Sequence, residues 1–401
     1  MPLFSIRTNR LPQDTRGPPD KSPPDKSPPD RSPPQNPPTE PAAAKTSAPV
    51  GTNGLATNSA AAPAIPAEAH APGLSGGIRV LVQPEDGPHP VIGLIAAARH
   101  SILIKQFSFD HPEVLDAVIA AHRNGRDVRV MLNPHRSSGD RANDATEAAL
   151  RAEGVAVAWS SPRFAVTHEK STVIDDTHAL IATFNLSEKY FSLTRDYGLV
   201  VQDRAAIAEI RACFEADWNH VPFHPPPGSS LLWSTANARH VMSAFIDSAE
   251  RSLDIQHPKF VDATILDRIA DARERGVKVR VLCGGRHGIS EWDVLDTFAA
   301  LRILYRLNVR VHKQKNMRLH AKLLIADDER ALVGSMNIDR SAFDLRRELG
   351  LIVSDPAAVK RLRGVFADDW EESHHYDAPD PLVAHTQTED DFPPDPDLMH
   401  E

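Results

Sequence analysis

Two stretches of this chain repeat one another, and this duplication is the feature that most restricts how the chain can fold. The strand-like runs Ser101–Gln106 and Asp127–Leu132 match the runs Ser252–Gln256 and Lys278–Leu282 later in the chain. In both copies a helical stretch and a glycine separate the two runs. A strand, a helix and a second strand joined in this way predict parallel pairing through a crossover helix.

Toward the end of each copy, residues of the same kind recur at a constant offset of 152. The matched pairs are His168 and His320, Lys170 and Lys322, Asp175 and Asp327, Asn185 and Asn337, Asp196 and Glu348, Gly198 and Gly350, and Trp218 and Trp370. One offset shared by so many pairs indicates the duplication of a whole structural unit. We therefore predict an α/β fold of two duplicated sandwich halves, with mixed, largely parallel sheets flanked by helices, packed about a pseudo-twofold axis.

The duplicated part covers residues 78–222 and 223–376, and both ends of the chain differ from it in composition. Residues 1–77 are rich in Pro, Ala, Ser and Thr and carry tandem Pro-Pro-Asp units, which predicts a disordered tether. Residues 377–401 hold eight acids and neither Lys nor Arg, which predicts a disordered acidic tail. Most of the net charge of −9 thus lies outside the core, which lacks the basic bias of a strong duplex binder.

Several protein classes are excluded by what the sequence lacks. The first ten residues contain no apolar run, so we expect no signal peptide, and no segment has the apolar length of a membrane span. Cys213 and Cys283 are too few for a disulfide framework or a structural zinc site, and we predict that both are buried. We expect a cytoplasmic protein or one bound peripherally to a membrane.

The residues that carry chemistry occur once in each half. His168 and Lys170, like His320 and Lys322, stand two apart before a strand-like run, which places both side chains on one face. An aspartate, a hydroxyl, an amide and an acid follow in each half: Asp175, Thr183, Asn185 and Asp196 in the first, and Asp327, Ser335, Asn337 and Glu348 in the second.

These paired His-x-Lys-x4-Asp motifs, each with its downstream Asn and acid, resemble the motifs of the phospholipase D superfamily, and the similarity is nearest to bacterial phospholipase D and cardiolipin synthase-like proteins. It leaves out the tether and the tail. The second half holds the fuller match, Gly334-Ser335-Met336-Asn337, whereas the first half has Ala182 in place of the glycine. We expect a local difference in geometry there rather than an inactive half.

The resemblance implies a role for each residue, and the chemistry of phosphodiester cleavage agrees with it. His168 is the expected nucleophile, by analogy with the family, and His320 the proton donor, with Asp196 and Glu348 orienting the histidines. The remaining residues are expected to bind phosphoryl oxygens (Lys170, Lys322, Asn185, Asn337, Thr183 and Ser335) or to support the motif locally (Asp175 and Asp327). No metal and no cofactor is implied.

The expected function is phospholipase D hydrolysis or phosphatidyl transfer through a phosphohistidine, on phospholipid at a membrane surface. The segments His257–Asp262 and Asn337–Leu345 look like the matching parts of cardiolipin synthases. Exposed apolar residues around Pro225–Trp233 are the expected membrane contact. Because one chain carries both motifs, we expect a monomer.

Two alternatives remain open at the level of sequence. One is a nuclease of the same superfamily, whose nucleic-acid substrate would follow a basic channel lined by Arg136, Arg141, Arg286, Lys313, Lys315 and Arg318. The other is a non-catalytic scaffold that recruits partners through the Pro-rich tether.

Overall fold

The computed structural model describes residues 73–136, 139–286, 289 and 291–383, and most of the predicted tether and acidic tail lies outside these residues. The first half contains β1 (Arg79–Gln83), α1 (His89–Ala96), β2 (Ser101–Gln106), α2 (Pro112–Arg123), β3 (Asp127–Leu132), α3 (Asp144–Ala152), β4 (Ala156–Trp159), β5 (Ser171–Ile174), β6 (His178–Ala182), α4 (Glu188–Ser192), β7 (Thr194–Val201) and α5 (Arg204–Trp218).

The second half repeats this order from β8 onward. It contains β8 (Leu231–Trp233), α6 (Ala238–Asp247), β9 (Ser252–Gln256), α7 (Ala263–Glu274), β10 (Lys278–Cys283), α8 (Glu291–Arg306), β11 (Arg310–Lys313), β12 (Arg318–Leu319), β13 (Leu323–Ala326), β14 (Arg330–Gly334), α9 (Arg340–Asp344), β15 (Leu349–Val353), α10 (Pro356–Glu372) and β16 (His374–His375). No helix among the described residues is long and apolar enough to cross a membrane.

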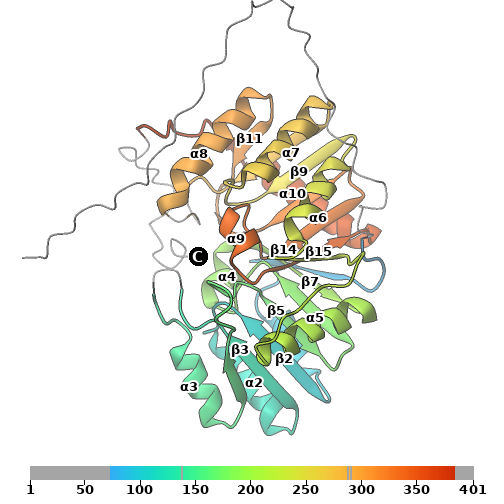
Figure 1. Ribbon diagram of the computed structural model, residues 1–401, viewed down its shortest axis with the longest axis vertical. Helices are drawn as coiled ribbons and strands as arrows, with labels where there is room; N and C mark the ends of the chain where they lie inside the picture. Colours follow the sequence, from blue (N-terminus) through green and yellow to red (C-terminus); the bar gives the residue numbers. More distant parts are fainter. Residues whose placement is uncertain (1–72, 137–138, 287–288, 290, 384–401) are drawn as a thin grey trace, which may run out of the picture. The chain divides into compact units, whose positions relative to one another are not determined.

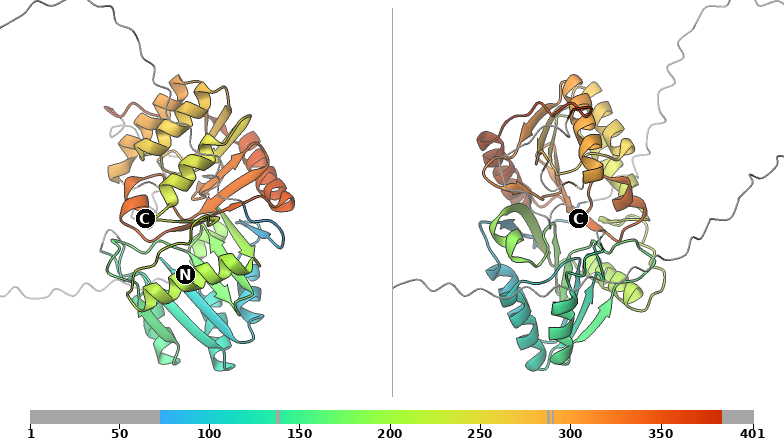
Figure 2. Two further views of the ribbon diagram at one scale, coloured as in Figure 1. Left: turned by 45° about the vertical axis from the view of Figure 1, so that its right-hand side comes forward. Right: turned by 90° about the vertical axis from the view of Figure 1, so that its left-hand side faces the viewer.

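Each half is built on one mixed sheet, and the two sheets have equivalent strand orders. The first runs β1-β7-β6-β5-β2-β3-β4, and the second runs β8-β15-β14-β13-β9-β10-β11 with β16 added at its edge. Figure 1 shows the first half in blue to green and the second in yellow to red, with β7, β14 and β15 where the halves meet. The halves also lie side by side in both views of Figure 2. The predicted α/β duplication is confirmed.

The proportion of parallel pairing differs from the prediction. Parallel ladders join β2, β3 and β4 in the first sheet and β9, β10 and β11 in the second, and the short strand β12 adds a parallel pair with β7. The pairs β1–β7, β7–β6, β6–β5 and β5–β2, and their counterparts in the second sheet, are antiparallel. The sheets are therefore mixed but not largely parallel. The reason is the connections: crossover helices join the parallel strands, while the tight turn between β5 and β6 permits only an antiparallel pair.

Three apolar clusters hold this arrangement together. One lies in the first half and includes Ile104, Val118 and Val130, and another lies in the second half and includes Ile255 and Phe298. The third is shared, because it combines residues of β7 and α5 with residues of β15 and α10. A core common to both halves means that neither sheet is closed without the other, since burial of apolar surface is the main stabilising term.

The two motif aspartates close the turns after β5 and β13. Asp175 and Asp327 adopt φ values of 52° and 58°, and each accepts hydrogen bonds from three consecutive backbone N–H groups at the start of the neighbouring strand. Burial alone would raise the pKa of both carboxyl groups, but these donors lower it. These contacts indicate that both aspartates stabilise the turns in which they lie.

Ordered structure extends slightly beyond the boundaries expected for the core. Leu74 pairs with Val353 of β15, and Gly76 N donates to Asp355 Oδ2 at 3.1 Å. On the other side, Tyr376 and Ala378 are buried in the core of the second half, and Arg302 Nη1 donates to Ala378 O at 3.0 Å. Residues 73–77 and 377–380 therefore belong to the packed structure rather than to the predicted tether and tail.

The difference between Ala182 and Gly334 has a structural cause. Gly334 lies opposite Gly350 on β15, and a Cβ atom at position 334 would stand 2.5 Å from Gly350 Cα. In the first sheet the equivalent Ala182 lies opposite Gly198 and its side chain is accommodated. The second sheet thus requires glycine at position 334.

We predict that Gly334→Ala lowers the free energy of unfolding by about 1–3 kcal/mol, because the added methyl meets backbone that cannot move aside. Ala182→Gly should cost only about 0.5–1 kcal/mol, through backbone entropy. Urea denaturation of both variants measures the two values. A Gly334→Ala protein as stable as wild type would show that the close contact exerts no constraint.

Candidate active site

Both motifs are held by backbone from the opposite half. His168 N and Glu169 N donate to Arg347 O at 2.9 Å, beside a bridge between Thr167 and Arg347. On the other side β12 pairs with β7, and His320 N donates to Arg195 O at 3.2 Å. The segment that precedes each motif histidine therefore pairs with the segment that precedes the acid of the other half.

This pairing joins each histidine to the acid of the other half. His168 Nδ1 lies 3.0 Å from both carboxylate oxygens of Glu348, and His320 Nδ1 lies 2.7 Å from Asp196 Oδ1. All four side chains are at most 2% exposed. Each acid stands 28 residues after the histidine of its own half in the sequence, but in the structure each histidine contacts the acid of the other half.

The two motif lysines lie on the same side of the strands as the histidines. Lys170 Nζ donates to His168 O at 2.8 Å, and Lys322 Nζ lies 2.7 Å from His320 O and 2.8 Å from His320 Nε2. Burial, followed by the charge of Lys170, holds the pKa of Lys322 well below its usual value. Two ammonium groups enclosed so close together favour the binding of an anion between them.

The two acids have different surroundings. Asp196 accepts from the hydroxyl groups of Thr183 and Thr194, at 2.5 and 2.6 Å, as well as from His320. Although burial opposes it, the contacts with His320, Lys322 and Thr183 lower the pKa of Asp196. Glu348 accepts from the hydroxyl group of Ser335, and burial raises its pKa to about 7. The two halves therefore present one firmly ionised carboxylate and one that changes its charge near neutral pH.

Burial also has the largest effect on the pKa values of the two motif histidines. It lowers the pKa of His320 to about 3, against the opposing influence of Asp196. The pKa of His168 is likewise well below its usual value, through burial and then the charges of Lys170 and Arg346. Both imidazoles are thus neutral at pH 7. Among the described residues, nothing lies within hydrogen-bond distance of His168 Nε2.

The remaining predicted site residues follow β6 and β14. The Thr183 hydroxyl contacts Asp196, and that of Ser335 accepts from Leu349 N at 3.1 Å and contacts Glu348. Asn185 and Asn337, two residues further on, are buried. The structure thus collects both histidines, both lysines and both acids in one enclosed region, with a hydroxyl beside each acid.

The profile of the family described as "Cardiolipin synthase, PLD-like domain" matches residues 91–218 and again residues 242–370. These two segments make up well over half of the chain and coincide with its two halves. The chain belongs to the phospholipase D superfamily.

Curated relatives in this superfamily include the major cardiolipin synthase of Bacillus subtilis, 26% identical over 233 residues, and a cardiolipin synthase of Staphylococcus aureus, 28% identical over 233 residues. Each alignment covers 50% of this chain and 47% or 46% of the relative. The chain therefore spans about half the length of the curated relatives it matches.

Two solved structures share the fold. Phosphatidylserine synthase of Haemophilus influenzae superposes with a TM-score of 0.63 at 15% identity, over 78% of this chain and 90% of that one. Polyphosphate kinase of Porphyromonas gingivalis gives 0.60 at 16% identity, over 75% and 48%. At these identities the likeness concerns the fold alone.

Several residues beside this phospholipase D-type site were not predicted. Phe107 packs edge-on against His168, and Tyr190 packs against His320, with ring centroids 4.9 Å apart in both cases. His257 is buried, with Nε2 3.2 Å from Met336 O and Nδ1 accepting from the backbone N–H of Lys259. None of the three has a like residue at the equivalent position of the other half, so a search for repeats could not find them.

A second group of charges lies beside the site. Lys259 Nζ is buried and contacts Asp293 at 2.7 Å and Asp339 at 3.2 Å. Asp339 also accepts from Ala342 N at the start of α9. Burial would raise the pKa of Asp339, but Lys259 and Arg346 lower it to about 2. Asp339 therefore remains ionised beside Lys259.

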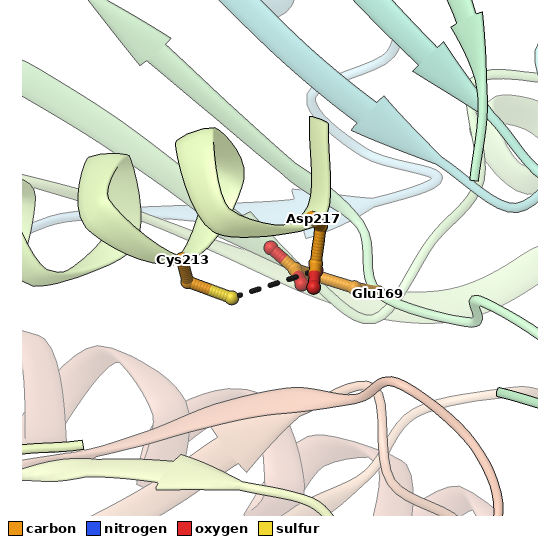
Figure 3. Close-up of side chains that lie close together, drawn as sticks. All are labelled: Glu169, Cys213 and Asp217. Atoms are coloured by element: carbon orange, nitrogen blue, oxygen red, sulfur yellow. Dashed lines mark hydrogen bonds between the residues drawn. The ribbon is translucent and has the colours of Figure 1, made fainter. Parts of the chain in front are cut away.

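Glu169, next to His168 in the chain, belongs to a buried charge cluster. Figure 3 shows Glu169, Cys213 and Asp217 close together, a set of donors that could hold a metal ion. Lys105 Nζ already lies among them, 2.9 Å from Glu169, 2.7 Å from Asp217 and 3.6 Å from Cys213 Sγ. Arg347 Nη2 adds a contact of 2.7 Å to Asp217. The carboxylates are thus balanced by protein cations, which makes the cluster a structural ion network.

Several further residues are buried away from the site. Cys213 and Cys283 are buried as predicted, and Trp218 and Trp370 pack into the shared core. His111, which precedes α2, is 3% exposed and contacts Phe191 and Glu188 of α4.

The two expected contact surfaces are also revised. Within the proposed membrane segment, Leu231–Trp233 form the buried strand β8, whereas Pro226 and Pro227 are exposed. Of the proposed basic channel, Arg136 and Lys313 are buried, and Arg141 is exposed and paired with Asp144 at 2.7 Å. These residues therefore do not share one exposed surface.

The low pKa of His257 makes a prediction about acid stability. Burial lowers the pKa of His257 to about 3. Below pH 6.5, therefore, this histidine binds a proton in the unfolded chain but stays neutral in the folded protein. Stability should therefore fall as pH drops. Between pH 6.5 and 4.5 wild type should lose about 2–3 kcal/mol more than His257→Gln.

Urea unfolding at the two pH values measures this difference. His240→Gln provides a matched control, because His240 is exposed and its removal should leave the pH dependence unchanged. If His257→Gln followed the wild-type curve as closely as the control does, the neutral state of His257 would be disproved.

Proposed function

We propose that this chain transfers the phosphatidyl group of a phospholipid through a phosphohistidine intermediate, without a metal ion. The observation that carries the proposal is the pair of crossed contacts, His168 with Glu348 and His320 with Asp196, enclosed with two lysines. Two imidazoles, each oriented by an acid at Nδ1, present Nε2 atoms that can attack phosphorus and exchange protons.

His168 is the proposed nucleophile. A neutral imidazole that donates Nδ1–H to the Glu348 carboxylate keeps its lone pair on Nε2, the atom without a partner among the described residues. Attack forms the P–N bond and breaks the bond between phosphorus and the headgroup oxygen. The lysine ammonium groups and the asparagine amides are proposed to hold the phosphoryl oxygens as charge develops on them.

His320 is the proposed acid and base. Its partner Asp196 has a lowered pKa and stabilises an imidazolium. An anionic phosphate between Lys170 and Lys322 would raise the pKa of His320 from its low value and offer Lys322 another acceptor. His320 then protonates the departing alcohol. In the second step it takes the proton of the acceptor alcohol, whose oxygen attacks phosphorus, and the P–N bond breaks to restore His168.

A phospholipid substrate is supported by the relatives. The curated proteins that the chain matches are named as cardiolipin synthases. Relatives named as synthases favour transfer to an alcohol over the hydrolysis that the same site would perform with water. The cardiolipin synthase-like segments Asn337–Leu345 and His257–Asp262 also meet at this site, since Phe260 forms a bridge with Ile338.

Trapping the intermediate tests the mechanism. With bis(4-nitrophenyl) phosphate, whose leaving group needs no protonation, His320→Ala should accumulate phosphoenzyme while His168→Ala should form none. Lipid turnover should fall by at least about 10³-fold in both variants. Acid-labile label, located by peptide mass spectrometry, reports the site. Label on His320 would reverse the assignment, and loss of wild-type activity in chelator would refute the metal-free chemistry.

The substrate class is tested with the purified protein on phosphatidylglycerol, phosphatidylcholine and single-stranded DNA. Conversion of phosphatidylglycerol to a product with two phosphatidyl groups is the expected result. Release of soluble headgroup alone would indicate a hydrolase. Cleavage of DNA without any reaction of lipid would establish the nuclease alternative instead, and no phosphoenzyme on any substrate would leave the scaffold alternative.

The raised pKa of Glu348 predicts the pH profile. Below about pH 7 the carboxyl group gains a proton and no longer accepts Nδ1–H of His168, so kcat/KM should fall on the acid side with an apparent pKa near 7. Glu348→Gln should lower the plateau and remove this acid limb. Asp196→Asn should lower activity but keep the limb. An acid limb unchanged in Glu348→Gln would show that another group controls it.

A further inference from the structure

One residue breaks the symmetry of the site. Arg346 stands two residues before Glu348, where the first half has Thr194 two residues before Asp196. Thr194 and Asp196 face the same way, since the Thr194 hydroxyl donates to Asp196 Oδ2 at 2.6 Å. Arg347, between Arg346 and Glu348, points the other way to Asp217. Arg346 itself stands at a bend before β15, and its charge lowers the pKa of both Glu348 and His168, which puts its guanidinium on their side of the chain.

The guanidinium of Arg346 is buried, and not all of its N–H groups have a hydrogen-bond partner among the described residues. The residue is 5% exposed, and its Nη1 atom has no hydrogen-bond acceptor among the described residues. The contacts that fix its position come from its backbone: its N donates to Ser341 O at 3.0 Å, and its O accepts from Ser234 Oγ at 2.5 Å. A buried donor left unmatched is unfavourable, so such a group in a native protein calls for a partner outside the chain.

Its charge acts on the proposed nucleophile. Among charged groups, only Lys170 lowers the pKa of His168 more than Arg346 does, and Lys322 acts less strongly. The other acid that Arg346 influences, Asp339, already contacts Lys259 and the N-terminus of α9. The guanidinium thus adds positive charge on the side of His168, and the first half has only the Thr194 hydroxyl at the equivalent place.

We propose that Arg346 is a third cationic ligand for the phosphodiester group, binding an anionic oxygen beside His168. The forked donors of a guanidinium match phosphoryl oxygens, and a charge-assisted contact would satisfy Nη1. Naming the ligand as the phosphodiester of a phospholipid rests on the proposed function. Arg346 would then place phosphorus nearer to His168 than to His320, so that two similar halves take different roles.

Two phosphodiesters can supply this oxygen in phosphatidyl transfer. One is the reacting group itself, and the other is the phosphate of an acceptor lipid such as phosphatidylglycerol, whose alcohol lies a few bonds from its own phosphorus. Both present the same monoanionic chemistry to Arg346. Substrates with one or two phosphodiesters distinguish them.

The direct test measures inorganic phosphate binding to the full chain by calorimetry. Arg346→Met should weaken binding about 10- to 100-fold, and Arg346→Lys should recover part of it. Arg340→Met is the matched control, an exposed arginine on α9, and should bind like wild type. Because an unmatched buried donor is removed, the urea midpoint of Arg346→Met should not fall below wild type. Unchanged phosphate affinity together with a lowered midpoint would assign Arg346 a structural role and overturn the proposal.

Kinetics then identify the source of the anion. A rise in KM for bis(4-nitrophenyl) phosphate in Arg346→Met assigns the contact to the reacting phosphate. A rise confined to phosphatidylglycerol as acceptor assigns it to the second phosphate. No change in either KM would also overturn the proposal. Phosphate binding through Arg346 in a protein without lipid turnover would leave this inference standing while refuting the proposed function, so the two can fail separately.

Discussion

The hydrogen bonds from His168 to Glu348 and from His320 to Asp196 are the interactions on which the rest of the structure depends. Each one joins the two halves, and each is shielded from water. A buried imidazole and a buried carboxyl group are costly alone, so the two halves must be docked before either histidine has its partner. The shared apolar core formed by β7, β15, α5 and α10 supplies the stabilisation for that docking.

The charges behind the site follow the same plan. Arg347 pairs with Asp217 on α5, and Arg195 pairs with Asp369 on α10 at 2.8 Å, so each arginine ties the strand before an acid to a helix of the other half. Buried ion pairs add little to stability, but these hold the backbone that accepts hydrogen bonds from the motif histidines. In the first half Lys105 and Glu169 extend the network, whereas their counterparts in the second half are Gln256 and Ala321.

A duplicated fold that acts on one phosphorus atom must lose its symmetry at the centre, because attack and protonation are different tasks. The scaffold is symmetric in strand order and in the crossed pairs. The electrostatics are not: Asp196 is surrounded by hydroxyl donors, while Glu348 has a raised pKa and Arg346 beside it. Two proton affinities pushed apart by their surroundings are what acid–base chemistry at neutral pH requires.

The sequence by itself determined the duplication, the α/β class and the list of paired residues, because repetition at one offset and strand alternation are local, one-dimensional signals. The same signals did not show in which direction β5 and β6 pair. These strands are antiparallel, so the sheets contain less parallel pairing than we predicted. Only the tertiary structure decided that each histidine takes the other half's acid, since that contact depends on how β7 and β15 meet. It also revealed Phe107, Tyr190, His257 and Arg346, which have no counterpart in the repeat and become neighbours of the site through packing alone.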